Sequence, residues 1–182
     1  KTSHPIADVR LKAALNRWLP LSIAVLDCEE ADIDFHARYS CTSKEYIYKI
    51  WNTEVRNPFL DGYALHYRYK LDEDMLNSAA QAYVGTHDFT SFCTLDSREK
   101  GDMTRTVKAF SVTREGNLVT MKVEADGFLY NMVRIMVGTL LRIQQGKIPV
   151  DGIAGIIEKK DRKFAGPTAQ PCGLYLNRVN YD

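Results

Sequence analysis

Close pairs of cysteine and histidine are missing from this sequence of 182 residues. The four cysteines form no CxxC pair and the four histidines are scattered, whereas a structural zinc site needs ligands in tight pairs that can reach one ion. We therefore expect no metal, and we expect reduced thiols packed as small apolar side chains.

Long apolar runs are also missing. The most apolar stretch, residues 128–143, contains Asn131 and Arg134 and is short for a membrane span. The first residues, Lys1-Thr-Ser-His-Pro, do not resemble a signal peptide, so we expect a cytoplasmic protein that does not cross a membrane. Because the sequence begins without methionine and without a strand before its first helix, we also expect it to be part of a longer protein.

An excess of one charge is the third absence. Lys and Arg number 24 against 23 Asp and Glu, which gives a net charge of +1. This balance excludes a histone-like polycation, but it does not exclude a nucleic-acid binder, because affinity for phosphates depends on where the cations lie. The length suits one domain or one large lobe of an enzyme.

Periodic patterns predict both helices and strands. Apolar residues at helical spacing predict four helices, at residues 9–18, 72–84, 128–145 and 151–159. Asp72 has the position of an N-cap, and Leu71 and Leu76 have the two positions of a hydrophobic staple around it. Alternating or β-type runs predict strands at residues 23–27, 40–51, 63–69, 107–113, 118–125 and 174–181. The two runs 107–113 and 118–125 form a hairpin, and helices interleaved with antiparallel pairs predict an α+β fold.

Two residues, Arg134 and Tyr46, could carry chemistry. Arg134 lies in a predicted helix that is apolar on two flanks and therefore largely buried. A functional role competes with the commoner ones, in which a buried arginine reaches the surface or pairs with a structural carboxylate. Tyr46 alternates with Tyr48 along a predicted strand, and such tyrosines belong to the core more often than to a site. Neither residue identifies a function by itself.

Longer motifs surround these residues in a fixed order. They are Phe35-His36-Ala37-Arg38, Lys44-Glu45-Tyr46-Ile47-Tyr48, His87-Asp88-Phe89-Thr90-Ser91-Phe92, the stretch from Asp126 to Leu140, Lys160-Asp161-Arg162, Ala165-Gly166-Pro167-Thr168-Ala169 and Gly173-Leu174-Tyr175-Leu176. In this order they resemble the characteristic regions of TruA-type tRNA pseudouridine synthases, from about Leu11 to the end of the chain. The resemblance implies the pseudouridine synthase α+β fold, an antiparallel sheet flanked by helices.

The resemblance also implies roles for individual residues. Family members convert uridine to pseudouridine at positions 38 to 40 of the tRNA anticodon stem-loop, without a metal or an organic cofactor. Arg134 would be the catalytic cation, which holds a carboxylate ionised in a fork of hydrogen bonds. Tyr46 would stack on the flipped uracil and is a candidate for proton transfer at C5, and Leu174 would help to wall the pocket. We expect Arg38 and Lys44 to contact phosphates, because of their charge and their place in the sequence.

One part of the family's site is not found in this sequence. The nucleophilic aspartate of the family lies in a GRTD-type segment followed by a Gly-Val-His run, and no aspartate here has that context. Asp126 adjoins the glycine of the arginine motif and is not expected to be the nucleophile. Arg162 could be structural or could face the RNA, and the structural role is favoured. We therefore expect residues 1–34 to be part of a connecting segment from an N-terminal lobe, and residues 35–182 to be the C-terminal catalytic and RNA-binding lobe. The 182 residues alone are expected to be inactive, whereas the full-length parent is expected to be a homodimeric isomerase that acts on tRNA.

Two other functions stay open. A non-catalytic RNA-binding α+β lobe would use aromatic strands and cations for docking alone, and a GRTD segment upstream in the parent gene would argue against it. A plain α+β interaction domain would bind no tRNA even when rejoined to an N-terminal half, and it would leave the ordered motifs as coincidence.

Overall fold

The computed structural model describes residues 6–94 and 101–181. The chain divides into two compact units, Lys1–Ser40 and Cys41–Asp182, and each is described by itself. Within the described residues, no helix has the length and apolar character needed to cross a membrane.

The smaller unit consists of one helix, α1 (Asp8–Trp18), and an extended segment held against it. Asn16 exchanges two hydrogen bonds with the backbone of Val25: Nδ2 donates to the carbonyl at 2.9 Å, and the amide donates to Oδ1 at 2.7 Å. Lys12 Nζ donates to the carbonyl of Leu26 at 3.1 Å. The predicted helix is confirmed. The predicted β-type run at residues 23–27 is wrong, because side chains of α1 take the backbone groups that a strand partner would need.

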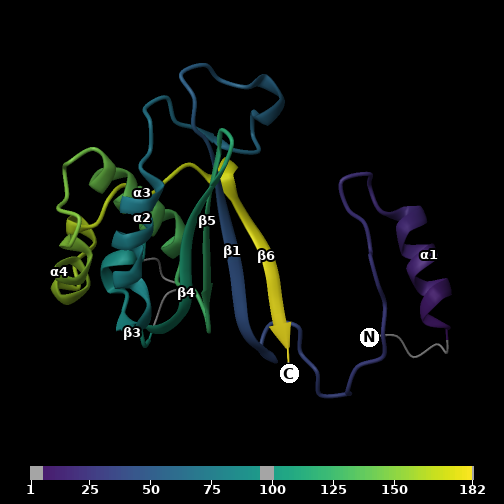
Figure 1. Ribbon diagram of the computed structural model, residues 1–182. Coiled ribbons are helices and arrows are strands. Elements are labelled where there is room, and N and C mark those ends of the chain that lie inside the picture. The colour runs from purple at the N-terminus through teal and green to yellow at the C-terminus, as the bar shows by residue number, and fades with distance from the viewer. Residues whose placement is uncertain (1–5, 95–100, 182) are drawn as a thin grey trace. The chain divides into compact units, whose positions relative to one another are not determined.

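The larger unit is built on a six-stranded sheet with the order β2-β1-β5-β4-β3, in which β6 also pairs with β1. Its strands are β1 (Cys41–Trp51), β2 (Leu65–His66), β3 (Gly85–Asp88), β4 (Thr104–Glu115), β5 (Leu118–Ala125) and β6 (Leu174–Tyr181). All pairs are antiparallel except β1 with β2. Figure 1 shows β6, β1, β5 and β4 side by side. The predicted α+β fold with an antiparallel sheet flanked by helices is confirmed.

The hairpin of β4 and β5 is the most local part of the sheet. Glu115 pairs with Leu118, so only Gly116 and Asn117 form the turn. Gly116 has a φ of +57°, a left-handed conformation that glycine adopts without steric cost. The predicted hairpin is confirmed, and β4 begins three residues earlier than the alternation of its apolar residues indicates.

Two short strands differ from the prediction. The run 63–69 contributes only Leu65 and His66 as β2, because the side chain of Asn52 takes the carbonyls of Tyr67 and Tyr69. Residues 85–88, for which the sequence pattern predicts no strand, form the edge strand β3 on β4. A strand of four residues is too short to show a clear alternation.

Three helices, α2 (Glu73–Ala80), α3 (Met132–Gln144) and α4 (Gly152–Lys159), cover one face of the sheet (Figure 1). The Asp72 N-cap is confirmed, because its Oδ1 accepts a hydrogen bond from the amide of Met75 at 2.9 Å. Leu71 and Leu76, the two staple residues, are fully buried. Short 3₁₀ helices lie between the larger elements: η1 (Pro58–Leu60), η2 (Gln81–Tyr83), η3 (Thr90–Phe92), η4 (Arg162–Phe164) and η5 (Pro171–Gly173).

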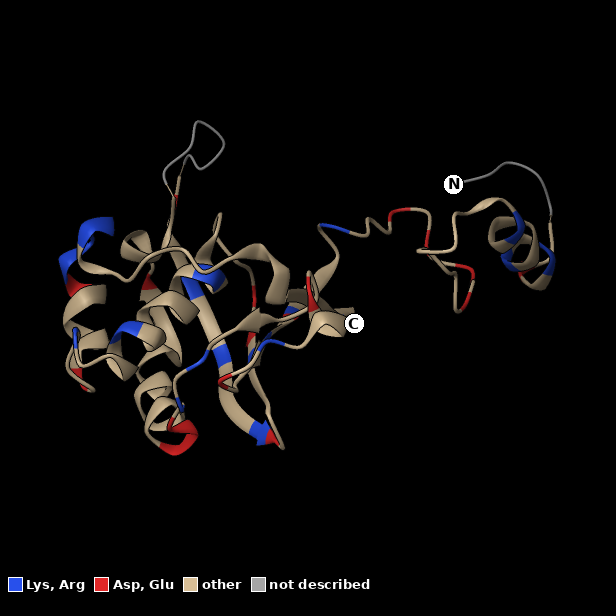
Figure 2. Ribbon diagram, turned by 90° about the horizontal axis from the view of Figure 1, so that it is seen from above, with Lys and Arg blue, Asp and Glu red and all other residues tan. Residues whose placement is uncertain are grey.

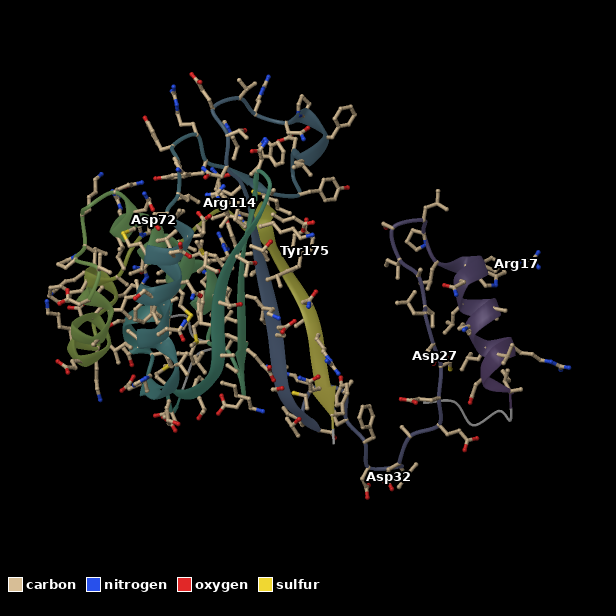
Figure 3. The ribbon with its side chains drawn as sticks, viewed as in Figure 1. Arg17, Asp27, Asp32, Asp72, Arg114 and Tyr175 are labelled. Carbon is tan, nitrogen blue, oxygen red and sulfur yellow. The ribbon has the colours of Figure 1, made fainter. Side chains whose placement is uncertain are left out.

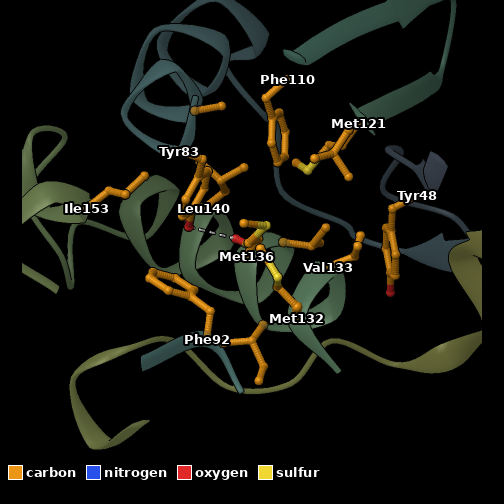
Figure 4. Close-up of a cluster of buried hydrophobic side chains, with 14 of the residues drawn as sticks. Tyr48, Tyr83, Phe92, Phe110, Met121, Met132, Val133, Met136, Leu140 and Ile153 are labelled. Atoms are coloured by element: carbon orange, nitrogen blue, oxygen red, sulfur yellow. Dashed lines mark hydrogen bonds between the residues drawn. The ribbon is translucent and has the colours of Figure 1, made fainter. Parts of the chain in front are cut away.

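The core lies between the helices and the inner face of the sheet. Figure 4 shows aromatic rings from β1, η2, η3 and β4 around the methionines and branched side chains of α3. The buried hydroxyl of Tyr83 donates to the carbonyl of Met136 at 3.3 Å, which satisfies a polar group that would otherwise be costly to bury. This packing fixes α3 against the sheet.

Candidate active site

A cavity of about 410 Å³ opens in the larger unit where β1, the start of α3 and the start of β6 meet. It is lined by Tyr46, Phe128, Leu129, Tyr130, Asn131, Met132, Val133, Arg134, Pro171 and Leu174. Three of the five predicted site residues, Tyr46, Arg134 and Leu174, therefore line one cavity. None of these described lining residues is an aspartate or a glutamate.

The guanidinium of Arg134 is held by two neutral acceptors. Nε donates to the carbonyl of Ala169 at 2.7 Å, and Nη1 donates to Oδ1 of Asn131 at 2.9 Å. The backbone carbonyl of Arg134 also accepts a hydrogen bond from the amide of Ala169 at 3.0 Å. Among residues 6–94 and 101–181, Nη2 has no hydrogen-bond partner and no carboxylate pairs with this arginine. Arg134 is therefore fixed in orientation and still has donors available for an anion.

A close backbone crossing brings Ala169 to Arg134. The segment 165–169 passes over α3 at Gly138, where an added Cβ would overlap the carbonyl oxygen of Pro167. A Cβ added to Gly166 would lie 2.5 Å from the carbonyl oxygen of Gly138. Thr139 Oγ1 accepts the amide of Gly166 at 2.8 Å, which fixes the register of the crossing. Two glycines on facing backbones are thus the local reason that Ala169 reaches the guanidinium.

Arg162 supports the same segment. Its guanidinium donates to the carbonyl of Ala165 at 3.4 Å and to Oγ1 of Thr168 at 3.3 Å. These contacts are those of a structural arginine, as expected from the sequence.

Asn131 is a site residue that the sequence prediction missed. It precedes α3 with a φ of +63°, in the left-handed region that asparagine tolerates better than most residues. Its Oδ1 accepts from Arg134, and its Nδ2 donates to Oγ1 of Thr94 at 3.2 Å. This conformation also explains why α3 begins at Met132 and not at Phe128, as the apolar pattern predicts. The signal was an asparagine inside an otherwise apolar helical pattern.

Tyr46 lies in the middle of β1, paired with Val123 of β5 and Leu176 of β6. Its ring meets the ring of Phe128 edge to face, with centroids 5.1 Å apart. The hydroxyl has no hydrogen-bond partner within the described part of the chain. Burial raises the pKa of this phenol, so it is protonated at neutral pH and can donate a hydrogen bond.

Tyr48, two residues along the same face of β1, has the structural role. It is fully buried, and its hydroxyl donates to the carbonyl of Gln170 at 2.6 Å. Burial, the nearby Cys172 and, in the opposite direction, Arg134 act on the pKa of Tyr48, and the net effect raises it. The turn η5 packs directly on its ring, since a Cβ added to Gly173 would lie 2.8 Å from it. Of the two strand tyrosines, Tyr48 holds η5 in place by its buried ring and its hydrogen bond to Gln170, and Tyr46 borders the cavity.

The three remaining predicted residues differ in their placement. Leu174 is the first residue of β6, opposite Tyr48, and borders the cavity. Lys44 precedes Tyr46 by two residues on β1 and so shares its face, and its amine has no partner among the residues described. Arg38 belongs to the smaller unit, where its guanidinium lies 5.7 Å from the ring centre of Tyr39.

Several motif residues serve the fold instead of the cavity. Asp126 accepts a hydrogen bond from the amide of Thr106 at 3.0 Å, next to the start of the hairpin. Ser91 Oγ donates to the carbonyl of Ile156 in α4 at 2.7 Å, and Asp88 forms an ion pair with Lys160 at 2.9 Å. The described residues contain no group of three His, Cys, Asp or Glu side chains that could hold a metal, and all four cysteines are free thiols.

A family model described as tRNA pseudouridine synthase matches residues 79–182, which include α3, the crossing segment and β6. The chain therefore belongs to the tRNA pseudouridine synthase family.

Individual relatives agree with this assignment. The chain is 46% identical to tRNA pseudouridine synthase A of Geobacillus sp. (strain WCH70) over 171 residues, which cover 94% of this chain and 68% of the relative. It is 43% identical to the protein of that name from Acetivibrio thermocellus, over 99% of this chain and 73% of the relative. It is 45% identical to the Geobacillus kaustophilus protein, over 100% of this chain and 70% of the relative.

Proposed function

We propose that this chain supplies part of the active site that isomerises uridine to pseudouridine in the anticodon stem-loop of tRNA, at positions 38 to 40. The observation that carries this proposal is the cavity in which Tyr46, Arg134 and Leu174 meet, although they come from three separate parts of the sequence. The relatives named as tRNA pseudouridine synthases support the same reaction class.

The chemistry explains why these side chains suit the task. In the reaction the N1–C1′ bond breaks, the uracil turns, and a C5–C1′ bond forms. The hydrogen at C5 leaves as a proton and N1 gains one, so no electrons are exchanged with a cofactor. A base that has left its stack is stabilised by stacking on an aromatic ring, which Tyr46 provides. Its protonated hydroxyl can donate a hydrogen bond to the uracil, and Leu174 provides an apolar wall.

We propose that Arg134 pairs with a carboxylate from a GRTD-type segment outside these 182 residues. Support comes from its two fixed hydrogen bonds to neutral acceptors and its remaining donors. Asp126 does not fit the role, because its carboxylate accepts from Thr106. On this proposal residues 1–34 are the end of a connecting segment, residues 35–182 are the C-terminal lobe, and the chain alone makes no pseudouridine.

Further parts of the proposal concern the tRNA and the assembly. Lys44 lies on the same strand face as Tyr46 and has a free amine within the described residues, which suits a phosphate contact. Arg38 has the same proposed role. Lys and Arg are interspersed with Asp and Glu in the larger unit (Figure 2), so RNA affinity must come from local placement of cations and not from overall charge. We also propose a cytoplasmic homodimer for the full-length form.

Tritium release from tRNA labelled at C5 of uridine tests the proposal. We expect no tritium release by the 182-residue chain. We expect release by a chimera in which this chain is preceded by the remaining N-terminal part of the relative from Geobacillus sp. (strain WCH70). The same chimera with the GRTD aspartate changed to asparagine is the control for the carboxylate. Clear turnover by the chain alone would contradict an external carboxylate.

The second candidate function is a non-catalytic RNA-binding lobe. The absence of an acidic side chain among the described residues of the cavity favours it for the chain in isolation. An inactive chimera, together with tight binding of tRNA by the chain, would support it. Absence of tRNA binding by both proteins would indicate an interaction domain instead.

A further inference from the structure

A second cavity, of about 650 Å³, lies beside the candidate active site. It is bounded by Trp51 at the end of β1, by residues between 56 and 66, and by Gln170 and Cys172. The first cavity is bounded by Pro171 and Leu174 of the same segment. The residues around η5 therefore form a wall between the two cavities, with neighbouring residues facing opposite sides.

The other wall belongs to residues 53–70, which we call the arm. Its two ends are fastened together at Asn52, whose Nδ2 donates to the carbonyls of Tyr67 and Tyr69 at 2.8 and 2.7 Å. Arg114 Nη2 donates to Oδ1 of Asn52 at 3.0 Å, and Arg114 Nε forms an ion pair with Glu73 at 2.9 Å. Figure 3 labels Arg114 near this closure. The arm is thus a loop whose two ends are held together by hydrogen bonds to Asn52, which Arg114 holds in turn.

The arm is also tied to β6. The hydroxyl of Tyr175, labelled in Figure 3, donates to the carbonyl of Tyr63 at 2.6 Å. Asn57 caps η1 by accepting the amide of Phe59 at 3.0 Å. A cavity with walls held in this way is formed before any ligand arrives, which reduces the entropy lost on binding.

The polar lining suits a nucleotide. Arg56 and Asp61 are exposed, and neither has a side-chain partner within the residues that the structure describes. Trp51 adds an aromatic ring, and its Nε1 is the one buried side-chain nitrogen or oxygen of the described residues without a hydrogen-bond partner. A guanidinium can bind a phosphate, a carboxylate can accept hydrogen bonds from the N–H groups of a base, and an indole can stack on the face of the base ring. The volume lies in the range of ligand sites, about 300–1,000 Å³.

The rest of the arm presents large apolar side chains to solvent. The relative exposures are 75% for Val55, 90% for Phe59, 64% for Tyr63 and 65% for Tyr69. The guanidinium of Arg68 lies 5.4 Å from the ring centre of Tyr69. Exposed rings interleaved with arginines are the composition of surfaces that bind single-stranded nucleic acid by stacking and charge.

We propose that the second cavity binds a nucleotide of the same RNA strand, next to the uridine that enters the first cavity. Residues 170–174 span at most about 14 Å, so nucleotides near each other in one loop can reach both sides of this wall. In this arrangement Arg56 contacts the phosphate, Asp61 accepts from the base, and Trp51 supplies a stacking surface. The inference rests on the proposed function, since it takes the first cavity as the uridine site.

Fluorescence of Trp51 tests the inference directly. Trp51 and Trp18 are the two tryptophans of the sequence, so Trp18→Phe leaves Trp51 as the only reporter. We expect quenching by an anticodon stem-loop RNA, and weaker binding when one loop nucleotide beside the target uridine is abasic. Arg56→Ala should weaken binding of the intact RNA about tenfold and should remove most of the effect of that abasic site, because the two changes delete the same contact.

Matched variants separate the possible outcomes. Arg142 lies on α3 and lines neither cavity. The Arg142→Ala variant should therefore bind the RNA with the same affinity as the unsubstituted chain. Asp61→Asn should alter the response to the abasic site without lowering the urea midpoint, because Asp61 is exposed and has no partner in the described chain. If the chain binds RNA but Arg56→Ala and Asp61→Asn change nothing, the second cavity is not a nucleotide site while the proposed function stands.

Two other results would also overturn the inference. If neither the chain nor the chimera binds stem-loop RNA, the proposed function fails and the nucleotide site fails with it. If Arg56→Ala or Phe59→Ala changes the oligomeric state by light scattering while RNA affinity is unchanged, the arm is a protein contact.

Discussion

Replacement of Gly138 by alanine is the sharpest test of how the site is held. The added Cβ would overlap the carbonyl oxygen of Pro167. A methyl group on a helix backbone has no rotamer that avoids this overlap, so α3 or the segment 165–169 must move. Movement of that segment would weaken the two hydrogen bonds between Ala169 and Arg134.

The magnitude follows from three contributions. Overpacking costs about 1–3 kcal/mol, and an unyielding backbone contact belongs at the upper end of that range. The weakened hydrogen bonds cost about 1 kcal/mol each, whereas alanine gains about 1 kcal/mol over glycine inside a helix. We expect Gly138→Ala to lower the free energy of unfolding by about 4 kcal/mol. Gly155→Ala, in the middle of α4 with nothing within 4 Å of its added Cβ, should raise it by about 0.5–1 kcal/mol.

Urea unfolding followed by circular dichroism measures both variants, and their difference isolates the close contact from helix propensity. Tritium release by the active chimera should also fall when it carries Gly138→Ala, because Arg134 loses its orientation toward the proposed carboxylate. If the two variants are stabilised alike, the backbone crossing does not exist and the account of how Arg134 is oriented is wrong.

Three further predictions concern the site and its support. Arg134→Lys in the active chimera should lose most tritium release although the charge is kept, because an ammonium cannot form the fork with a carboxylate; near-normal turnover would remove that pairing. Asn131→Gly and Asn131→Ala should both lose the hydrogen bond to Arg134, but the alanine variant should unfold more easily by about 1–2 kcal/mol, because only glycine tolerates the left-handed backbone; equal urea midpoints would contradict this. Burial opposes ionisation of Asp88, but Thr90 and Lys160 outweigh it and keep the pKa of that carboxyl below its usual value. Asp88 therefore stabilises the fold above its unfolded-state pKa of about 3.9 and stops doing so as the pH falls through its lower folded-state pKa. Urea midpoints measured from pH about 6 to about 3 should fall less steeply for Asp88→Asn, and an unchanged slope would count against the ion pair.

The elements that the sequence predicted well are those whose signal is local. The hairpin of β4 and β5, the Asp72 N-cap and α4 depend on residues within a few positions of one another. The failures depend on distant partners. Residues 23–27 are extended because Asn16 binds them, and the sequence of that run does not record it.

The site divides in the same way. Motif residues such as Tyr46 and Arg134 could be named from the sequence, because a resemblance carries their positions. The groups that hold these side chains in place could not be named from the sequence. The carbonyl of Ala169 has no side-chain signature, and the overlap of Gly138 with Pro167 appears only when two segments about thirty residues apart cross. Residues 63–69 of the arm were predicted as a strand, because their aromatic residues have high β propensity, whereas only Leu65 and His66 form one and the rings of Tyr63 and Tyr69 are exposed.

The anion that pairs with Arg134 is either a carboxylate of the enzyme or a phosphate of the RNA, and the two can be distinguished by measurement. Within the described residues, Ala169 and Asn131 use two of the five N–H donors of the guanidinium, so either an RNA phosphate or a carboxylate could take the others. Lysine is a good phosphate ligand as a point charge, but it does not reproduce a fork to a carboxylate. A phosphate contact also contributes about one unit to the slope of log affinity against log salt, whereas a carboxylate pair formed within the enzyme does not. If Arg134→Lys abolishes turnover and Arg134→Ala leaves the salt slope of RNA binding unchanged, the partner is a carboxylate. If turnover persists in Arg134→Lys and Arg134→Ala lowers the salt slope by about one unit, Arg134 belongs to the RNA-binding surface and another residue is the cation of the active site.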